Sequence, residues 1–140
     1  MTIRVLVADD QPLIRQALRT LIDADPDMAV VAEAATGVEA VVRCRAGLAD
    51  VVLMDNHMPD LNGVEASRQI TSDPDLATVR VLMHTVFVTE ELVTAALPAG
   101  VAGFLSKGVD AGTLLQTIRD VAPPRAREVS AAGPRPRALG

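Results

Sequence analysis

The chain has 140 residues, enough for one domain with a sizeable core, and 49% of them are hydrophobic. Two Phe, no Trp and no Tyr exclude base stacking on aromatic side chains as a main mode of binding single-stranded nucleic acid. The net charge of −5 argues against a nucleic-acid-binding surface over the whole chain. The single cysteine excludes an internal disulfide and a thiolate metal cluster.

Neither a membrane span nor a secretion signal is predicted. The longest uncharged run, residues 92–106, contains one Pro and two Gly and is shorter than the roughly 20 apolar residues that a span needs. The first ten residues already include two Asp, unlike a signal peptide. We therefore expect a cytoplasmic protein without a membrane partner.

Short aliphatic runs alternate with segments of helical periodicity along the chain. The runs predict strands at residues 3–8, 29–34, 51–54, 79–84 and 101–105. The periodic segments predict helices at residues 12–22, 38–44, 63–71, 89–97 and 111–121. Several runs are apolar without alternation, which is typical of strands covered on both faces. The pattern predicts an α/β fold, with a parallel sheet between two layers of helices.

The composition changes after residue 120. The last twenty residues contain four Pro, four Arg and one acidic residue, a net charge of +3, whereas residues 1–120 carry −8. So few large aliphatic residues cannot form a core of their own. We expect a folded domain over residues 1–121 and a Pro/Arg-rich linker or disordered tail over 122–140.

Charged and hydroxyl residues follow the predicted strands at their carboxyl ends, where open parallel sheets bind ligands. These residues are Asp9, Asp10, Asp55, Thr85 and Lys107. Crowded carboxylates need a cation among them, and oxygen ligands favour Mg²⁺ over zinc. A carboxylate beside Mg²⁺, with a hydroxyl and an ammonium placed for anionic oxygens, suits phosphoryl transfer to an aspartate.

Each of these residues also has an ordinary structural interpretation. The Asp9-Asp10 pair can cap the following helix, Thr85 can simply end a strand, and Lys107 can be solvated. Their joint position at the strand ends favours a functional site. His84 faces away from Thr85 by strand alternation, and we interpret it as a hydrogen-bonded core histidine.

Four segments of the chain together resemble the receiver domain of two-component response regulators, over residues 3–121. They read VLVADDQPLIRQAL at 5–18, DVVLMDNHMPDLNGVEA at 50–66, VRVLMHT at 79–85 and AGVAGFLSK at 99–107. The sequences of these segments are most similar to those of the NarL/FixJ subfamily, whose members usually continue into a DNA-binding helix-turn-helix domain. The resemblance implies a flavodoxin-like receiver fold with strand order 2-1-3-4-5 and five helices on both faces.

The resemblance also implies the roles of the acidic residues. Asp55 would accept a phosphoryl group from a sensor histidine kinase. Asp9, Asp10, Asp55 and the backbone carbonyl of His57 would hold Mg²⁺ and its water shell. The protein would be a signalling module and not an enzyme.

Thr85 and Lys107 would, by the same resemblance, contact the phosphoryl oxygens. Phe104 stands at the switch position and would turn inward when Thr85 moves toward the phosphate. This movement would alter the face formed by the fourth helix, the fifth strand and the fifth helix. Pro98 is expected to end or kink the fourth helix.

The implied output is transcription regulation through a DNA-binding effector domain that we expect to be absent from this chain, with possible homodimerisation on phosphorylation. Two alternatives stay open. One is a stand-alone or atypical receiver that serves as an interaction module without phosphorylation, which the departures from the subfamily pattern at His57 and Val86 favour. Asn56 also departs from that pattern. The other is a phosphatase of the haloacid-dehalogenase type. Such an enzyme requires a second acidic residue two positions after the nucleophilic aspartate, where this chain has His57.

Overall fold

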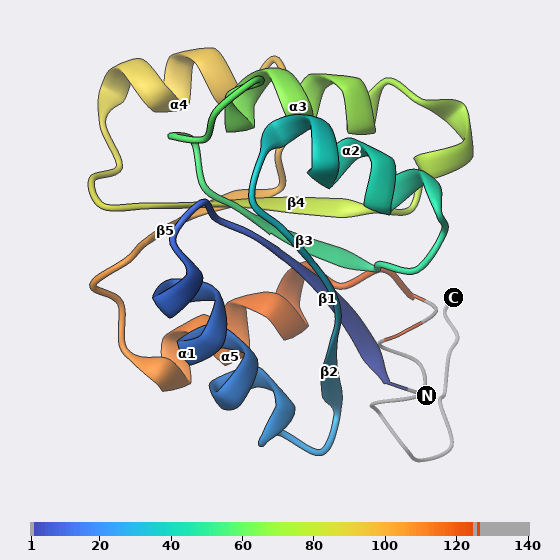
Figure 1. The fold of residues 1–140 in the computed structure, drawn as a ribbon, viewed down its shortest axis with the longest axis vertical. Helices are drawn as coiled ribbons and strands as arrows, with labels where there is room; N and C mark the ends of the chain where they lie inside the picture. The colour runs from blue at the N-terminus through green and yellow to red at the C-terminus, as the bar shows by residue number, and fades with distance from the viewer. Residues whose placement is uncertain (1, 125, 127–140) are drawn as a thin grey trace.

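A parallel five-stranded sheet in the order β2-β1-β3-β4-β5 forms the centre of the molecule, which confirms the expected fold (Figure 1). The computed structural model describes residues 2–124 and 126. The strands are β1 (Ile3–Ala8), β2 (Met28–Ala34), β3 (Val51–Met54), β4 (Arg80–Thr85) and β5 (Gly103–Ser106). Because all strands run parallel, their carboxyl ends lie at one edge of the sheet.

Helices cover both faces of this sheet. They are α1 (Pro12–Asp23), α2 (Gly37–Arg45), α3 (Gly63–Thr71), α4 (Glu90–Ala96) and α5 (Ala111–Val121). Figure 1 shows α2, α3 and α4 on one face and α1 and α5 on the other. No helix within the described residues combines the length and apolarity that a membrane span requires.

The core consists of two apolar clusters, one on each face of the sheet. Successive residues of β1 alternate between them: Leu6 belongs to the cluster under α2, α3 and α4, whereas Val5 and Val7 belong to the cluster under α1 and α5. All three are fully buried. The apolar run without alternation therefore correctly indicated a strand that is covered on both sides.

The boundaries differ from the prediction where chain geometry rather than composition decides them. β5 begins at Gly103 instead of residue 101, because its pairing with β4 starts only there. A short 3-10 helix, η1 (Pro74–Leu76), was not predicted. α4 ends at Ala96, just before Pro98, which confirms the expected helix end.

Core packing continues past the predicted domain boundary at residue 121. Ala122 and Ala126 are buried in the cluster under α1 and α5, beside Ile118 of α5. The backbone N–H of Ala126 donates to the carbonyl of Pro123 at 3.0 Å. The rest of the predicted tail, residues 125 and 127–140, lies outside the described residues.

Candidate functional site

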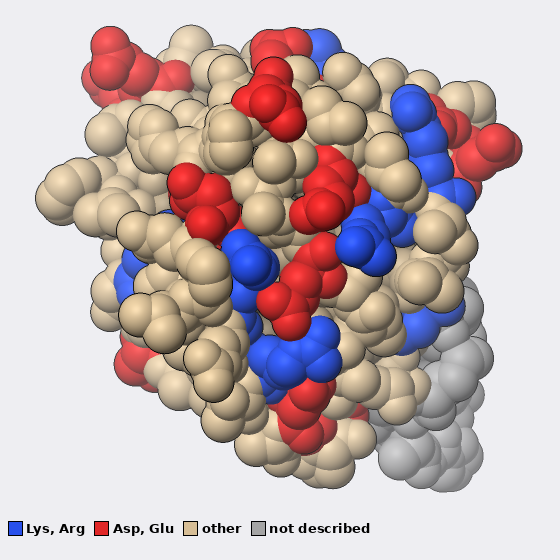
Figure 2. Space-filling view, in the orientation of Figure 1, with Lys and Arg blue, Asp and Glu red and all other residues tan. Residues whose placement is uncertain are grey.

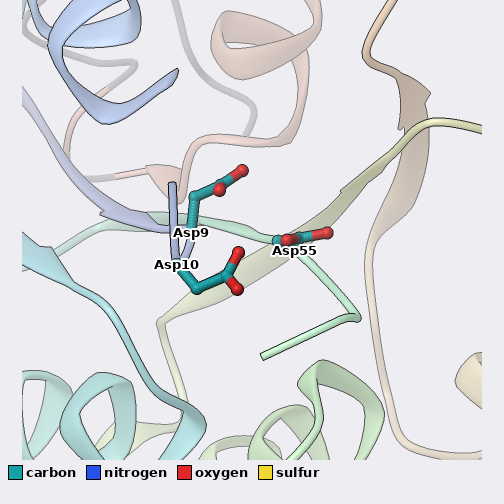
Figure 3. A group of neighbouring side chains, drawn as sticks. All are labelled: Asp9, Asp10 and Asp55. Carbon is teal, nitrogen blue, oxygen red and sulfur yellow. The ribbon is translucent and has the colours of Figure 1, made fainter. Parts of the chain in front are cut away.

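Three aspartates meet at the carboxyl edge of the sheet (Figure 3). Asp9 and Asp10 follow β1, and Asp55 follows β3, the neighbouring strand. One carboxylate oxygen of each lies within 4.8 Å of the others. Asp9 and Asp55 are buried, at 1% and 4% exposure, whereas Asp10 is exposed. Two adjacent parallel strands thus bring Asp55 and the Asp9-Asp10 pair, which are far apart in sequence, around one small volume.

Lys107, directly after β5, brings a positive charge into this group. Its Nζ lies 2.8 Å from Oδ2 of Asp9 and 3.5 Å from Oδ2 of Asp55. Burial disfavours the charged ammonium, yet the hydrogen bond to Asp9 and the charges of Asp55 and Asp9 together raise the pKa of Lys107. The ammonium is therefore charged at neutral pH, and it balances one of the three carboxylates.

The pKa of Asp55 is raised above its ordinary value of 3.8. Burial is the largest cause, because it penalises the carboxylate form, and the negative charge of Asp9 is the second. Lys107 and the N–H of His57, 3.4 Å from Oδ1 of Asp55, act in the opposite direction without cancelling the effect. The negative charge of ionised Asp55 is thus only partly balanced by its surroundings, and a bound cation would stabilise it.

Metal-free Asp55→Asn is expected to be more stable than the natural chain at pH 7. The stabilisation linked to protonated Asp55 is complete below pH 3.8 and is lost as the pH rises through its raised folded-state pKa. Asn imitates the neutral acid, so it keeps this stabilisation at high pH. Urea unfolding followed by circular dichroism, in EDTA, should show the advantage of the variant shrinking toward pH 3.8. An advantage that grows on acidification would contradict the raised pKa.

The turn between β1 and α1 is fixed by hydrogen bonds that the sequence did not reveal. The N–H of Gln11 donates to Oδ1 of Asp9 at 2.9 Å, and Nη1 of Arg15 donates to the backbone carbonyl of Asp9 at 2.6 Å. Arg15 also pairs with Glu33 of β2 at 3.1 Å. Arg15 of α1 therefore binds the carbonyl of Asp9, and Glu33 of β2 orients the arginine side chain.

The loop after Asp55 is tied to the start of α3 through Asn56. Oδ1 of Asn56 accepts the N–H of Val64 at 3.1 Å, and its backbone carbonyl accepts the N–H of Gly63 at 3.0 Å. These two donors are among the first N–H groups of the helix, which lack partners inside it. Asn56, considered above only as a departure from the subfamily, thus connects the acceptor loop to a helix.

Asn56→Ala is expected to lower the free energy of unfolding by about 1–2 kcal/mol, because it leaves the N–H of Val64 without its acceptor. Denaturant titration measures the loss. Gln69→Ala is the matched control, since Gln69 is an exposed side chain on the same helix, and it should change stability by less than about 0.5 kcal/mol. Equal losses in the two variants would show that the Asn56 side chain does not secure the loop.

Thr85 lies beside a cavity. It is the last residue of β4, is 3% exposed, and lines a cavity of about 510 Å³ together with His57 and Val86. Phe104 of β5 is half-buried and packs against the cluster under α2, α3 and α4. Space for a movement of the segment after β4 is therefore present next to the loop that follows Asp55.

His84 lies on the face of β4 opposite Thr85, as alternation predicts, and is buried at 5% exposure. The expected hydrogen bond is wrong: its ring has no such partner among residues 2–124 and 126. Burial, followed by the charge of Lys107, lowers the pKa of His84 and keeps the ring neutral.

Opposite charges are interspersed over the face of the molecule seen in Figure 2. Figure 2 shows acidic and basic side chains next to one another on the viewed face. Ion pairs on the molecule include Arg19 with Glu33 at 2.7 Å and Arg45 with Asp73 at 3.3 Å. Asp9, Asp10 and Asp55, by contrast, place three acids around one small volume beside the single ammonium of Lys107, an arrangement that suits a cation and an anionic group bound together.

Comparison with known proteins finds one family for nearly the whole described chain. The family "Response regulator receiver domain" matches residues 5–119. The chain is 40% identical over 119 residues to "Response regulator UvrY" of Escherichia coli K12, covering 85% of this chain and 54% of that protein. It spans about half the length of the curated relatives that it matches.

Two solved structures share the fold closely. The signal receiver domain of the putative response regulator NarL from Mycobacterium tuberculosis superposes with a TM-score of 0.80 at 31% identity, covering 90% of this chain and 97% of that one. The response regulator domain of Thermotoga maritima CheB gives a TM-score of 0.78 at 36% identity, covering 86% and 96%.

Proposed function

Since the chain belongs to the response regulator receiver domain family, we propose that Asp55 accepts a phosphoryl group and that its phosphorylation is the signal. The observation that carries this proposal is the meeting of Asp9, Asp10 and Asp55 with Lys107 at one edge of the sheet. Receiver domains are signalling modules, and Asp55 is buried at this edge beside both an acid, Asp9, and the ammonium of Lys107.

In the proposed step, an Oδ atom of Asp55 attacks phosphorus and the P–N bond of a phosphohistidine breaks. The electron pair of that bond stays on the imidazole nitrogen of the donor, which then takes up a proton. Lys107 would pair with a phosphoryl oxygen, a role that the distance of 3.5 Å between its Nζ and Oδ2 of Asp55 supports. The Thr85 hydroxyl would bind a second oxygen after the segment that follows β4 moves, and Phe104 would turn inward with it.

The residues present fit a divalent cation with oxygen ligands. Three carboxylates and one ammonium leave two negative charges, and hard cations such as Mg²⁺ prefer carboxylate and carbonyl oxygens. Asp10, Asp55 and the backbone carbonyl of His57 would hold the ion, with Asp9 supporting its waters. Bound there, Mg²⁺ would neutralise charge on the transferred group.

Mg²⁺ is expected to stabilise the chain against unfolding by about 1.4 kcal/mol at ten times its dissociation constant, because it binds the folded state alone. Asp10→Asn should lose most of this gain, and it is a suitable variant because Asp10 is exposed. Urea unfolding with and without the ion measures both. The same gain in Asp10→Asn would place the ion elsewhere.

The proposed function is tested by incubating the chain with acetyl phosphate and Mg²⁺ and measuring its intact mass. A mass increase of one phosphoryl group that disappears with EDTA is the expected result. A chain that never forms the adduct would favour the interaction module without phosphorylation. Repeated turnover of varied phosphate esters would favour the phosphatase.

We further propose that this protein is cytoplasmic, that a sensor histidine kinase supplies the phosphoryl group, and that the output is transcription regulation. The relative LnrK of Bacillus subtilis is named a transcriptional regulatory protein, and this chain spans 53% of its length. A DNA-binding part would thus lie outside the receiver domain, connected through residues 122–140. Homodimerisation on phosphorylation, through the face of α4, β5 and α5, is part of this proposal.

A further inference from the structure

A second cavity, of about 280 Å³, opens between α1 and α5 on the side of the sheet away from α3 and α4. Most of its walls are apolar: Leu18 and Leu21 of α1, and Leu114 of α5 with Val109 before it. Its volume is close to the lower end of the roughly 300–1,000 Å³ that small-molecule sites occupy, and its apolar lining is typical of them. The cavity therefore has the size and walls of a site for a small, compact molecule.

The imidazole of His84 is the polar group of this cavity. His84 is 5% exposed, lines the cavity, and has no hydrogen-bond partner for its ring among the residues described above. The ring nitrogens are not among the fully buried side-chain atoms of the described residues that lack a partner, so they reach solvent through the cavity and can hydrogen-bond water there. A molecule that enters the cavity with a donor or acceptor group would replace that hydrogen bond to water, and its apolar body would gain contact with the leucine side chains.

Charge at the cavity favours a neutral occupant. Lys107 also lines it, but its Nζ already pairs with Asp9 and Asp55. An anion would bring its charge toward those two carboxylates, and a cation would meet the ammonium. The neutral ring of His84 can donate one hydrogen bond and accept another.

We propose that this cavity is a binding site for a small neutral molecule with a ring-sized apolar body and one hydroxyl or N–H group, which bonds to the imidazole of His84. The body would pack between Leu18 and Leu114, and the polar group would face His84. The site lies on the opposite face of β4 from Thr85 and does not depend on phosphoryl transfer.

Phenol and toluene are the probes, because they share the ring and differ in the hydroxyl. Amide chemical shifts of the unphosphorylated 140-residue chain are followed by NMR as each probe is added. Phenol should give saturable shifts centred on His84, α1 and α5. His84→Leu should weaken phenol binding about fivefold, which is the effect of one hydrogen bond, and leave toluene binding unchanged or stronger.

Ala17→Leu provides a second variant, which keeps the test valid if His84→Leu folds poorly. Ala17 is exposed and lines the cavity, so a larger side chain should fill the cavity and weaken both probes without disturbing the core. Absence of saturable shifts, shifts centred elsewhere, or equal phenol affinity in His84→Leu would overturn the proposal. So would phenol affinity that falls with rising protein concentration, which would assign the cavity to contact with a second copy.

Discussion

Asp55→Asn is expected to form no phosphoryl adduct with acetyl phosphate and Mg²⁺, while the natural chain gains the mass of one phosphoryl group. The loss should be complete, because an amide oxygen is a poor nucleophile and cannot form the acyl phosphate. Intact-mass spectrometry at neutral pH measures it. Asp55→Asn should still fold, since the side chain keeps its size and the raised pKa shows that the buried position tolerates a neutral group.

Asp60→Asn is the matched control for this experiment. Asp60 is exposed on the same loop and has a φ of 71°, a left-handed conformation that Asn adopts readily. Its variant should therefore fold and be phosphorylated like the natural chain. Loss of the adduct in both variants would point to general damage of the loop, and an adduct that persists in Asp55→Asn would refute Asp55 as the acceptor.

Gly63→Ala is expected to destabilise the chain by about 3 kcal/mol. A Cβ at this position would lie 2.2 Å from the backbone carbonyl oxygen of Asp55 and 2.9 Å from Cα of Asn56. Both neighbours belong to the backbone, so the clash cannot be relieved by rotating a side chain. Either α3 or the acceptor loop must move. Denaturant unfolding measures the loss of stability.

The same variant should also slow phosphorylation, by about 100-fold, because a shift of about 1 Å at a reacting group has an effect of that size. Gly108→Ala is the control: its Cβ would meet the nearest atom, Oγ of Ser106, at 3.6 Å, an ordinary contact. It should stay within about 0.5 kcal/mol of the natural chain. Normal stability and rate in Gly63→Ala would show that α3 does not brace Asp55.

These two experiments separate the chemistry of the site from its support. Asp55→Asn removes the nucleophile and keeps the fold, whereas Gly63→Ala keeps the nucleophile and disturbs its position. The support includes hydrogen bonds on both sides of the site, from Arg15 to the carbonyl of Asp9 and from Val64 to Asn56. A site that holds acids so close together needs such bracing, because their mutual repulsion favours separation.

Most of the architecture could be predicted from local patterns. The strands Ile3–Ala8 and Val51–Met54 and the helices Gly63–Thr71 and Ala111–Val121 have the predicted bounds. Their signals are periodicity and composition within a few residues, which do not depend on the rest of the chain. The start of β5 was misplaced because it depends on pairing with β4, which a local pattern does not contain.

The candidate site was predictable as a set of residues and not as a supported structure. Asp9, Asp10, Asp55 and Lys107 could be brought together in advance because parallel strands share one carboxyl edge. Two features of its support could not be predicted: Asn56 accepts a hydrogen bond from the start of α3, and Gly63 packs closely against the backbone of Asp55. Both depend on the path of the turn between β3 and α3, for which the sequence has no signal.

The amino-acid sequence by itself determined the alternation of strands and helices, the side of β4 on which His84 lies, and the acids at the strand ends. Each follows from short-range periodicity and from strand direction. Only the tertiary structure decided that Lys107 pairs with Asp9 at 2.8 Å, that Arg15 holds its carbonyl, and that the ring of His84 faces a cavity without a partner. Those features depend on angstrom-scale distances between elements, which are set by packing of the whole core.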